Sequence, residues 1–260
     1  MKIIPKKSLG QNFLANKGVV QKILNAAEIT NNDLVLEIGP GKGVLTEELR
    51  KKADRVIAIE KDHRLINDLK NTFREFSNVE IIEGDVLKFN PYSIFPSPCS
   101  IFHIPYKVVA NIPYYITSHL LKTIFEKWPM PELVVLMVQK EVAQRITARS
   151  PKMNLLALSV QFFAEPKIIS YVSRGSFRPM PKVDSAIIQL VPKYGIGNME
   201  YGIKDRFFKL IKTAFAGKRK QLKNTISAEI LKKAGIKPES RPEELSLDDW
   251  VTLAQKCVKI

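Results

Sequence analysis

The feature that most constrains this chain is a regular alternation of short apolar runs with helical patterns over its first three quarters. Short β-rich runs bounded by turn residues predict strands, and the longer amphipathic stretches between them predict helices. Strands separated by helices form βαβ units, so we expect an α/β fold with a mostly parallel sheet and helices on both faces. The predicted strands are 34–38, 55–60, 79–82, 108–110 and 133–138, and the predicted helices are 44–53, 62–76, 117–127 and 140–148.

The alternation of strand and helix patterns ends after about residue 165. Residues 167–172 and 185–191 have the pattern of two strands without a helix between them, which predicts an antiparallel pair at the end of the sheet. Residues 192–198 have the composition of a linker. Only helical periodicity follows, over 204–216, 222–234 and 247–258. We therefore predict two domains, 1–195 and a small helical domain over 196–260.

The chain carries an excess of positive charge. It has 41 Lys and Arg against 26 Asp and Glu, which gives a formal net charge of +15. Such an excess attracts polyanions and favours a nucleic-acid partner. General solubility would explain the same charge, so charge alone does not separate the two interpretations.

Composition disfavours several classes of protein. Hydrophobic residues make up 45% and charged residues 26% of the chain, which argues against disorder. The longest apolar run, 133–138, is too short to cross a bilayer, and the first residues lack the apolar run of a secretion signal. The two cysteines and three histidines have no ligand-like spacing. We therefore expect no metal site, no disulfide and a reducing, cytoplasmic compartment.

A glycine-rich turn, Glu37 to Gly43, follows the first predicted strand. Its spacing is G-x-G-x-G, whereas dinucleotide-binding folds use G-x-G-x-x-G. Pro40 removes a backbone N–H that a pyrophosphate would need, and Glu37 places a carboxylate beside the turn. These features favour a cationic ligand. They disfavour a NAD-dependent dehydrogenase, for which the sequence also offers no hydride-transfer acid or base.

Acids also end the next two predicted strands. Glu60 follows Gly39 by about 20 residues, the distance at which an acid can accept both hydroxyls of a ribose. Asp85 follows the third strand, where a carboxylate can accept from an adenine amino group. Each acid taken singly is more simply a strand-end cap. Together at one sheet edge they predict a site for an adenosine with a positive, phosphate-free tail, and S-adenosylmethionine fits that description.

The fourth predicted strand ends in Asn111-Ile112-Pro113-Tyr114. An adenine N6 amine is a poor nucleophile because its lone pair is delocalised into the ring. The Asn111 side-chain oxygen and the Ile112 carbonyl would accept its two hydrogens and localise the lone pair. Pro113 would stiffen the loop, and Tyr114 would offer a face for stacking. The motif alone is more simply a turn, but its place after three cofactor motifs favours catalysis.

With these motifs the chain resembles the small-subunit ribosomal RNA adenine dimethyltransferases, the bacterial KsgA/RsmA type, over nearly its whole length. The resemblance implies a Rossmann-like S-adenosylmethionine-dependent methyltransferase domain followed by a small helical domain. It implies a monomer that dimethylates N6 of two adjacent adenosines in a hairpin loop near the 3′ end of small-subunit (16S) rRNA, in an immature 30S particle, during ribosome biogenesis. The motifs that carry it are 6–14, 37–43, Glu60, 84–85, 111–114, 139–143, 177–186, 215–224 and 241–246.

The resemblance also implies the site residues, with Phe177 facing Tyr114 across an extruded target base. The implied cofactor-binding residues are Asn12, Leu14, Gly39, Gly41, Glu60, Lys61, Asp85, Val86 and Asn111. The implied catalytic residues are Asn111, Ile112, Pro113, Tyr114 and Phe177. The chain departs from the family pattern at Tyr115, where Asn is common, at 153–155, where a Tyr-Gly turn is usual, and in an added stretch at 97–105.

Positive charge is concentrated between residues 201 and 223, where eight Lys and Arg stand against Asp205 alone. A charge run is usually a solvated helix face, but so few acids among so many bases favour a track for phosphates. The predicted RNA-binding residues are Lys6, Lys7, Arg178, Lys182, Lys218, Arg219, Lys220 and Lys223.

Two other functions compete with this prediction. Antibiotic-resistance methyltransferases that act on large-subunit rRNA share the N-terminal and Asn111–Tyr114 motifs, but the 177–186 and 216–224 stretches favour the small-subunit type. A non-catalytic RNA-binding assembly or transcription factor could keep the same fold. The intact Glu60, Asp85 and Asn111 argue against that alternative.

Overall fold

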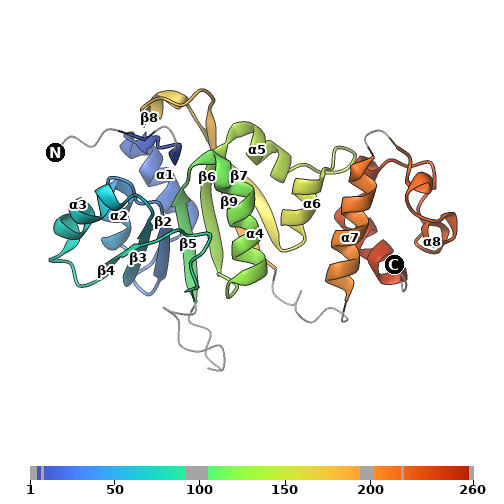
Figure 1. Ribbon diagram of the computed structural model, residues 1–260, viewed down its shortest axis with the longest axis horizontal. Coiled ribbons are helices and arrows are strands. Elements are labelled where there is room, and N and C mark those ends of the chain that lie inside the picture. The colour runs from blue at the N-terminus through green and yellow to red at the C-terminus, as the bar shows by residue number, and fades with distance from the viewer. Residues whose placement is uncertain (1–4, 7–8, 92–104, 194–201, 218–219, 258–260) are drawn as a thin grey trace. The chain divides into compact units, whose positions relative to one another are not determined.

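The computed structural model describes residues 5–6, 9–91, 105–193, 202–217 and 220–257. Its central feature is a seven-stranded sheet with the strand order β4-β3-β2-β5-β6-β9-β7 (Figure 1). A two-stranded sheet pairs β1 (Phe13–Leu14) with β8 (Phe177–Arg178). The strands of the large sheet are β2 (Leu34–Ile38), β3 (Arg55–Glu60), β4 (Val79–Glu83), β5 (Tyr106–Asn111), β6 (Leu133–Gln139), β7 (Ala164–Val172) and β9 (Ser185–Pro192).

Strands β4, β3, β2, β5 and β6 pair in parallel, and β9 runs antiparallel to β6. The order of connection reverses between β2 and β5, because the chain builds outward from β2 to β4 and then returns to add β5 on the other side of β2. In open α/β sheets such a reversal leaves a crevice beyond the carboxyl ends of the strands. The topology therefore places the ends of β2, β3, β4 and β5 at one edge, where a ligand can bind.

Both faces of the sheet are covered. Side chains alternate between the two faces of a strand, and neighbours such as Val35 and Leu36 on β2 are both almost fully buried. Val35 belongs to the core cluster that α1 (Lys17–Ala27) and α2 (Val44–Arg50) form with the sheet. Strands buried on both faces explain the near-continuous apolar runs in the sequence.

Helix α3 (His63–Phe73) follows β3 and packs at the β4 end of the sheet. The Asp62 side chain caps it by accepting from the Arg64 backbone N–H. Leu65, Leu69 and Phe73 recur at four-residue spacing and are buried together on one helix face. The two remaining helices of this part of the chain are α4 (Thr117–Lys127), drawn in front of the sheet in Figure 1, and α5 (Lys140–Ile146).

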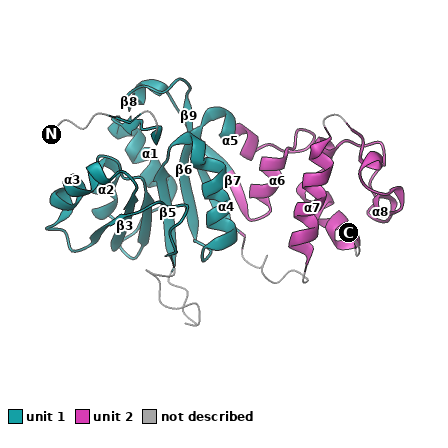
Figure 2. Ribbon diagram, in the orientation of Figure 1, with its two compact units in different colours: residues 1–143, 167–192 teal, residues 144–166, 193–260 magenta. Residues whose placement is uncertain are grey.

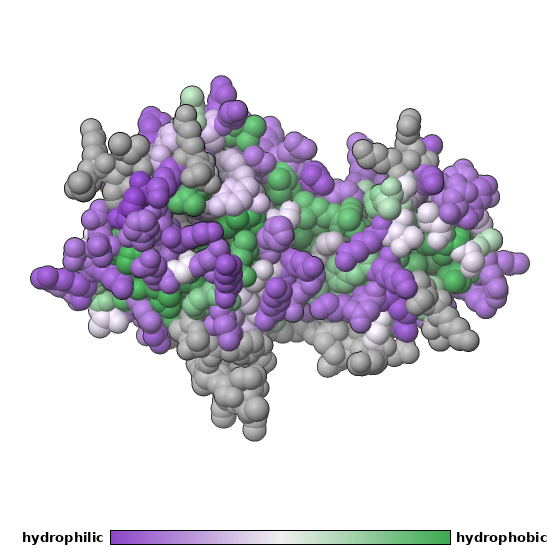
Figure 3. Space-filling view, in the orientation of Figure 1, coloured by the Kyte–Doolittle hydropathy of each residue, from purple (hydrophilic) through white to green (hydrophobic). Residues whose placement is uncertain are grey.

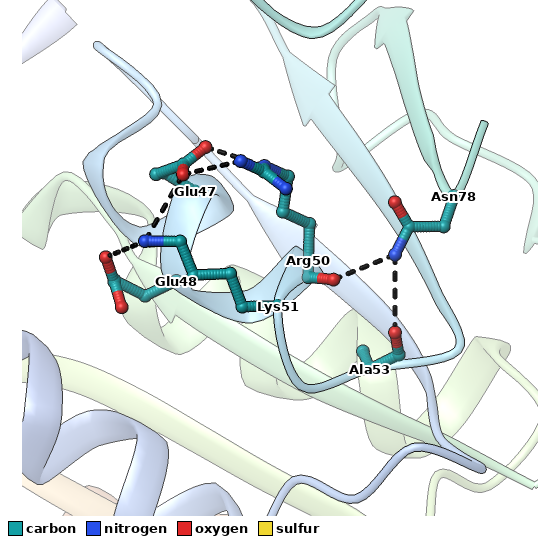
Figure 4. Close-up of polar contacts among 6 residues, drawn as sticks. All are labelled: Glu47, Glu48, Arg50, Lys51, Ala53 and Asn78. Atoms are coloured by element: carbon teal, nitrogen blue, oxygen red, sulfur yellow. Dashed lines mark hydrogen bonds and ion pairs between the residues drawn. The ribbon is translucent and has the colours of Figure 1, made fainter. Parts of the chain in front are cut away.

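Polar contacts fix the end of α2 against the start of β4 (Figure 4). The Asn78 side-chain nitrogen donates to the backbone oxygens of Arg50, at 2.8 Å, and Ala53. Arg50 pairs with Glu47, while Lys51 pairs with both Glu47 and Glu48. Asn78 thereby satisfies carbonyls that the helix end leaves without a partner in the helix.

The contacts divide the chain into two compact units, residues 1–143 with 167–192, and residues 144–166 with 193–260 (Figure 2). The second unit contains α6 (Leu155–Gln161), α7 (Ile203–Ala216), α8 (Ala228–Lys233) and α9 (Leu247–Lys256). Aromatic rings from its two segments pack together, with the ring centroids of Phe162 and Phe207 4.4 Å apart. The predicted boundary at 195 lies close to one of these divisions, but no local pattern marks 144–166 as part of the helical unit.

Hydrophilic residues cover most of the face drawn in Figure 3, with apolar residues showing between them. Within the described ranges, no helix combines the length and apolar character needed to cross a membrane.

The predicted α/β fold with a parallel-rich sheet and helices on both faces is confirmed, as is the C-terminal helical region. The two late strands are neighbours at the end of the sheet. The single helix predicted over 222–234 is wrong: residues 222–224 form a 3-10 turn, and Ser227 starts the short helix α8 by accepting from the Ile230 N–H. Strands β1 and β8 and helices α1 and α6 were not predicted from the sequence. Most of the 97–105 stretch lies outside the described residues.

Candidate active site

One pocket lies at the edge where β2, β3, β4 and β5 end. It is lined by residues 9–14, by the glycine-rich turn, by the ends of the next three strands and by Phe177 of β8. The lining includes every residue that the sequence analysis assigned to the cofactor or to catalysis: Asn12, Leu14, Gly39, Gly41, Glu60, Lys61, Asp85, Val86, Asn111, Ile112, Pro113, Tyr114 and Phe177. The fold therefore brings these residues together, while their individual roles stay predictions.

The glycine-rich turn is shaped by backbone conformations that favour glycine. Gly41 and Gly43 have φ angles of +60° and +77°. A Cβ atom on Gly41 would lie 3.0 Å from the Phe13 ring, and one on Gly43 would lie 2.8 Å from the Phe73 ring. Side chains at these positions would push the N-terminal segment and α3 away from the turn.

Glu60 at the end of β3 is held by the backbone around it. One of its carboxylate oxygens accepts from the Gly41 N–H at 3.1 Å, and the other accepts from the Asp62 N–H at 2.8 Å. Burial raises the pKa of Glu60, although both N–H groups oppose that shift. The carboxylate thus ties the glycine turn to the end of β3 and still reaches the pocket, where oxygen lone pairs can accept from ribose hydroxyls.

Asp85 follows β4 on the pocket rim. Its Oδ2 atom pairs with Lys61 Nζ at 2.8 Å, and its Oδ1 atom accepts from the Leu87 N–H at 3.1 Å. Burial would raise the pKa of Asp85, but the hydrogen bonds from Lys61 and Leu87 lower it below its ordinary value. Asp85 is therefore ionised and acts as an acceptor at neutral pH, beside the apolar side chain of Val86.

Glu37 is the most buried acid in the pocket wall, with 1% of its surface exposed. Burial raises its pKa to about 8. Its Oε2 atom has no hydrogen-bond partner among the described residues. With this pKa the buried Glu37 carboxyl keeps its proton at neutral pH, and a positive charge brought into the pocket would favour its ionised form.

The predicted catalytic loop follows β5. The Tyr114 hydroxyl lies 2.7 Å from the Ser185 hydroxyl on β9, and burial raises the Tyr114 pKa. Asn111 and Pro113 are half-buried at the pocket, and Ile112 is buried. Phe177 lines the same pocket but is only 1% exposed and belongs to the hydrophobic core, as does Leu14 beside it on β1. These two side chains therefore have a packing role besides the role predicted from the resemblance.

The predicted RNA-binding residues lie in several parts of the chain. Arg178 ends β8, and Lys182 lies between β8 and β9, so both belong to the unit that holds the pocket. Those that the structure describes are all exposed: Lys6, Arg178, Lys182, Lys220 and Lys223. Lys7, Lys218 and Arg219 lie outside the described residues.

Sequence reasoning missed three side chains that support the site. Ser185 fixes the Tyr114 hydroxyl, and Asp62 accepts from Gln11 at 2.8 Å. Gln11 lies inside the 6–14 motif, so the sequence marks Gln11 itself but not its contact with Asp62. Asp62 and Ser185 contact residues distant in sequence, and no local pattern marks such contacts.

The pocket fits S-adenosylmethionine on observations of its own structure. The unpartnered Glu37 acceptor suits a cationic ligand, and Glu60 and Asp85 supply acceptors at neighbouring strand ends. A Cβ on Gly39 would meet no atom closer than 3.8 Å, and one on Gly84 would meet none within 4 Å, so both glycines leave the backbone open to a ligand.

Comparison with known proteins identifies relatives over nearly the whole length of the chain. The family model described as ribosomal RNA adenine dimethylase matches residues 5–259. A ribosomal RNA small subunit methyltransferase A of Dehalococcoides mccartyi is 44% identical over 259 residues, covering 95% of this chain and 87% of the relative. A protein of the same name from Clostridioides difficile is 38% identical, covering 95% of this chain and 89% of the relative.

Two solved structures are similar as well. A dimethyladenosine transferase from Plasmodium falciparum has a TM-score of 0.79 and 29% identity, covering 93% of this chain and 95% of the other. The 23S rRNA methyltransferase ErmE has a TM-score of 0.76 and 27% identity, covering 95% of this chain and 100% of the other.

Proposed function

This chain belongs to the ribosomal RNA adenine dimethylase family, and we propose that it dimethylates two adjacent adenosines in the 3′-terminal hairpin loop of small-subunit (16S) rRNA, with S-adenosylmethionine as the methyl donor. The enzyme class follows from family membership. One observation supports the site most strongly: the acids predicted to hold an adenosine and the loop predicted to hold an adenine amine line the same pocket.

The chain's acids would hold and orient the methyl donor. Glu60 accepts from the ribose hydroxyls, Asp85 accepts from the adenine amino group, and Val86 packs on the adenine ring. Gly39 lets the methionine end approach the backbone, and Asn12 and Leu14 close over it. A positive charge on that end would favour the ionised form of Glu37, whose buried Oε2 atom has no partner among the described residues. When bound, S-adenosylmethionine supplies a methyl group on a positively charged sulfur, and the carbon–sulfur bond breaks as the bond to the adenine nitrogen forms.

The loop after β5 would activate the adenine amine. The Asn111 side-chain oxygen and the Ile112 carbonyl accept the two N6 hydrogens, which draws the lone pair out of conjugation and toward the methyl group. Tyr114, fixed by Ser185, stacks on the target base. The methylated nitrogen loses its proton to water. No general base of shifted pKa is required, because positioning and electrostatics do most of the work.

The relatives favour the small subunit over the large one. Proteins named for the small subunit are 38–44% identical to this chain, whereas the 23S rRNA methyltransferase ErmE is 27% identical. We propose that the chain acts as a monomer on an immature 30S particle in the cytoplasm. A loop adenosine is the favoured target because extruding a base that is already unpaired costs less free energy.

Methyl transfer from labelled S-adenosylmethionine would test the proposal. Unmodified small-subunit particles and large-subunit RNA are assayed in parallel, and the labelled nucleoside is identified, with Asn111→Ala as the inactive control. N6,N6-dimethyladenosine in the small-subunit sample alone is the expected result. Label only in large-subunit RNA would support the resistance-type alternative. RNA binding without label in either sample would support a non-catalytic assembly factor.

A further inference from the structure

A short chain of hydrogen bonds connects the N-terminal segment to the cofactor loop. The Gln11 side-chain nitrogen donates to Asp62 Oδ2 at 2.8 Å, and the Asp62 backbone N–H donates to Glu60 Oε1 at 2.8 Å. The other oxygen of Glu60 accepts from the Gly41 N–H. Asp62 thus lies between the segment that lines one side of the pocket and the carboxylate predicted to hold the ribose.

Asp62 itself is rigidly placed. Its side chain is 1% exposed, and Arg64 donates to both of its oxygens, at 2.9 Å from Nε and 2.6 Å from Nη2. Hydrogen bonds from Arg64 and Gln11 hold the pKa of Asp62 well below its usual range. Asp62 is therefore a fixed, charged acceptor for Gln11 at neutral pH.

Gln11 is bonded at both ends of its amide. Besides donating to Asp62, it accepts from the Lys6 backbone N–H through Oε1 at 2.8 Å. Residues 9–14 line the pocket, and the last two of them form β1, which pairs with β8 through Leu14 and Phe177. The segment is thus held at its end by the β1–β8 ladder and near its middle by Gln11.

We propose that Gln11 and Asp62 form a positioning pair that holds residues 9–14 over the cofactor pocket and thereby sets affinity for the cofactor. The inference rests on the proposed function, because it assumes that the pocket binds S-adenosylmethionine. We assign neither side chain a part in methyl transfer itself. The pair acts through Asn12 and Leu14, which it holds against the ligand, and through Glu60, which the Asp62 backbone orients.

Gln11→Leu tests the pair, since it keeps a side chain of similar size and removes both the donor to Asp62 and the acceptor for the Lys6 N–H. A hydrogen bond to a buried charged group has an energy that corresponds to roughly tenfold or more in a binding constant. We expect the dissociation constant of S-adenosylhomocysteine, measured by calorimetry, to rise about tenfold. We expect kcat at saturating S-adenosylmethionine to change less than about threefold, and the amides of residues 9–14 to exchange faster with solvent.

Two further variants make the result specific. Gln21→Leu removes a glutamine on α1 whose amide bonds to Asn25, and it is expected to match the wild type in every readout. Gln11→Lys keeps a donor able to reach Asp62 and is expected to restore affinity to within about threefold of the wild type.

The outcomes separate this inference from the proposed function. Wild-type affinity for S-adenosylhomocysteine in Gln11→Leu would overturn the proposed role of Gln11 and Asp62. An equal loss of that affinity in Gln11→Leu and Gln11→Lys would overturn it as well. Absence of S-adenosylhomocysteine binding by the wild-type protein would instead overturn the proposed cofactor. Binding without methyl transfer to RNA would overturn the proposed reaction and leave the calorimetric test of Gln11 valid.

Discussion

The Tyr114 and Ser185 hydroxyl oxygens lie 2.7 Å apart, which joins the loop after β5 to β9 across 71 positions of sequence. Ser185 is fully buried, and Tyr114 is half-buried at the pocket. The ring predicted to stack on the target base therefore has its orientation fixed from the sheet as well as from its own loop.

Ser185→Ala is expected to release the Tyr114 ring. The lost hydrogen bond corresponds to about 1 kcal/mol of stability, measurable as a small shift in the denaturant midpoint. Because a stacking face that moves binds its base less well, we expect KM for RNA to rise several-fold with little change in S-adenosylmethionine affinity. Tyr114→Phe, which also loses the bond but keeps the ring, should behave similarly, whereas Tyr114→Ala should lose about a hundredfold in kcat/KM. Equal activity in Tyr114→Ala and the wild type would rule out the stacking role.

The sheet and its site edge were predictable because their signals are local. Each acid of the pocket follows an apolar run, and parallel strands place such positions at one edge, so Glu60 and Asp85 could be placed together before the structure was known. Helix α1 had usable signals as well, with Asn16 as its N-cap and Val19, Val20, Ile23 and Leu24 at helical spacing.

Other features had no local signal. The bond from Gln11 to Asp62 spans 51 positions, and that from Tyr114 to Ser185 spans 71. Such contacts depend on which strands become neighbours, and residue type does not determine that. The helix predicted over 222–234 failed for a different reason: apolar periodicity continues across Ser227, where a side-chain cap ends one local structure and begins the next.

Asn111→Ala and Glu60→Ala are expected to separate catalysis from cofactor binding. Asn111 would contact the target amine, so its loss should abolish methylation while S-adenosylmethionine affinity falls only slightly. Glu60 would hold the ribose, and its carboxylate also bonds the Gly41 and Asp62 N–H groups, so its loss should weaken affinity by a factor of about ten or more. Single-turnover assays and calorimetry measure the two effects separately. Wild-type turnover in Asn111→Ala would falsify the catalytic assignment of the loop.

Glu37 should make stability depend on pH. Its pKa is raised to about 8 by burial, so the folded protein retains a proton that the unfolded chain releases above its ordinary value of 4.5. The stability from this group is therefore full below about pH 4.5 and is lost as pH rises through about 8. Between about pH 5.5 and 7.5 the expected loss is on the order of 2 kcal/mol.

Glu37→Gln removes the titration and keeps the shape, so it tests this expectation. We expect the variant to gain stability relative to the wild type as pH rises, measured by urea unfolding at matched pH values. Glu132→Gln, at an exposed glutamate just before β6, is the control and should follow the wild type. Parallel curves for Glu37→Gln and the wild type would show that Glu37 is ionised in the folded protein across this range.

Neutralising Lys218, Arg219 and Lys220 together should weaken RNA binding and reduce its dependence on salt. Each contact to a single-stranded phosphate contributes about 0.7 to the slope of log affinity against log salt, so losing three contacts should reduce that slope by about 2. The net charge also falls by three, and this alone would slow association. A second variant neutralises the exposed Lys232, Lys233 and Lys237 and changes the net charge by the same amount at a different place in the sequence. If 218–220 contact the RNA, the first variant loses slope and the second does not. Equal slopes of log affinity against log salt in the two variants would show that the loss of net charge causes the effect. The RNA phosphates would then bind outside residues 218–220.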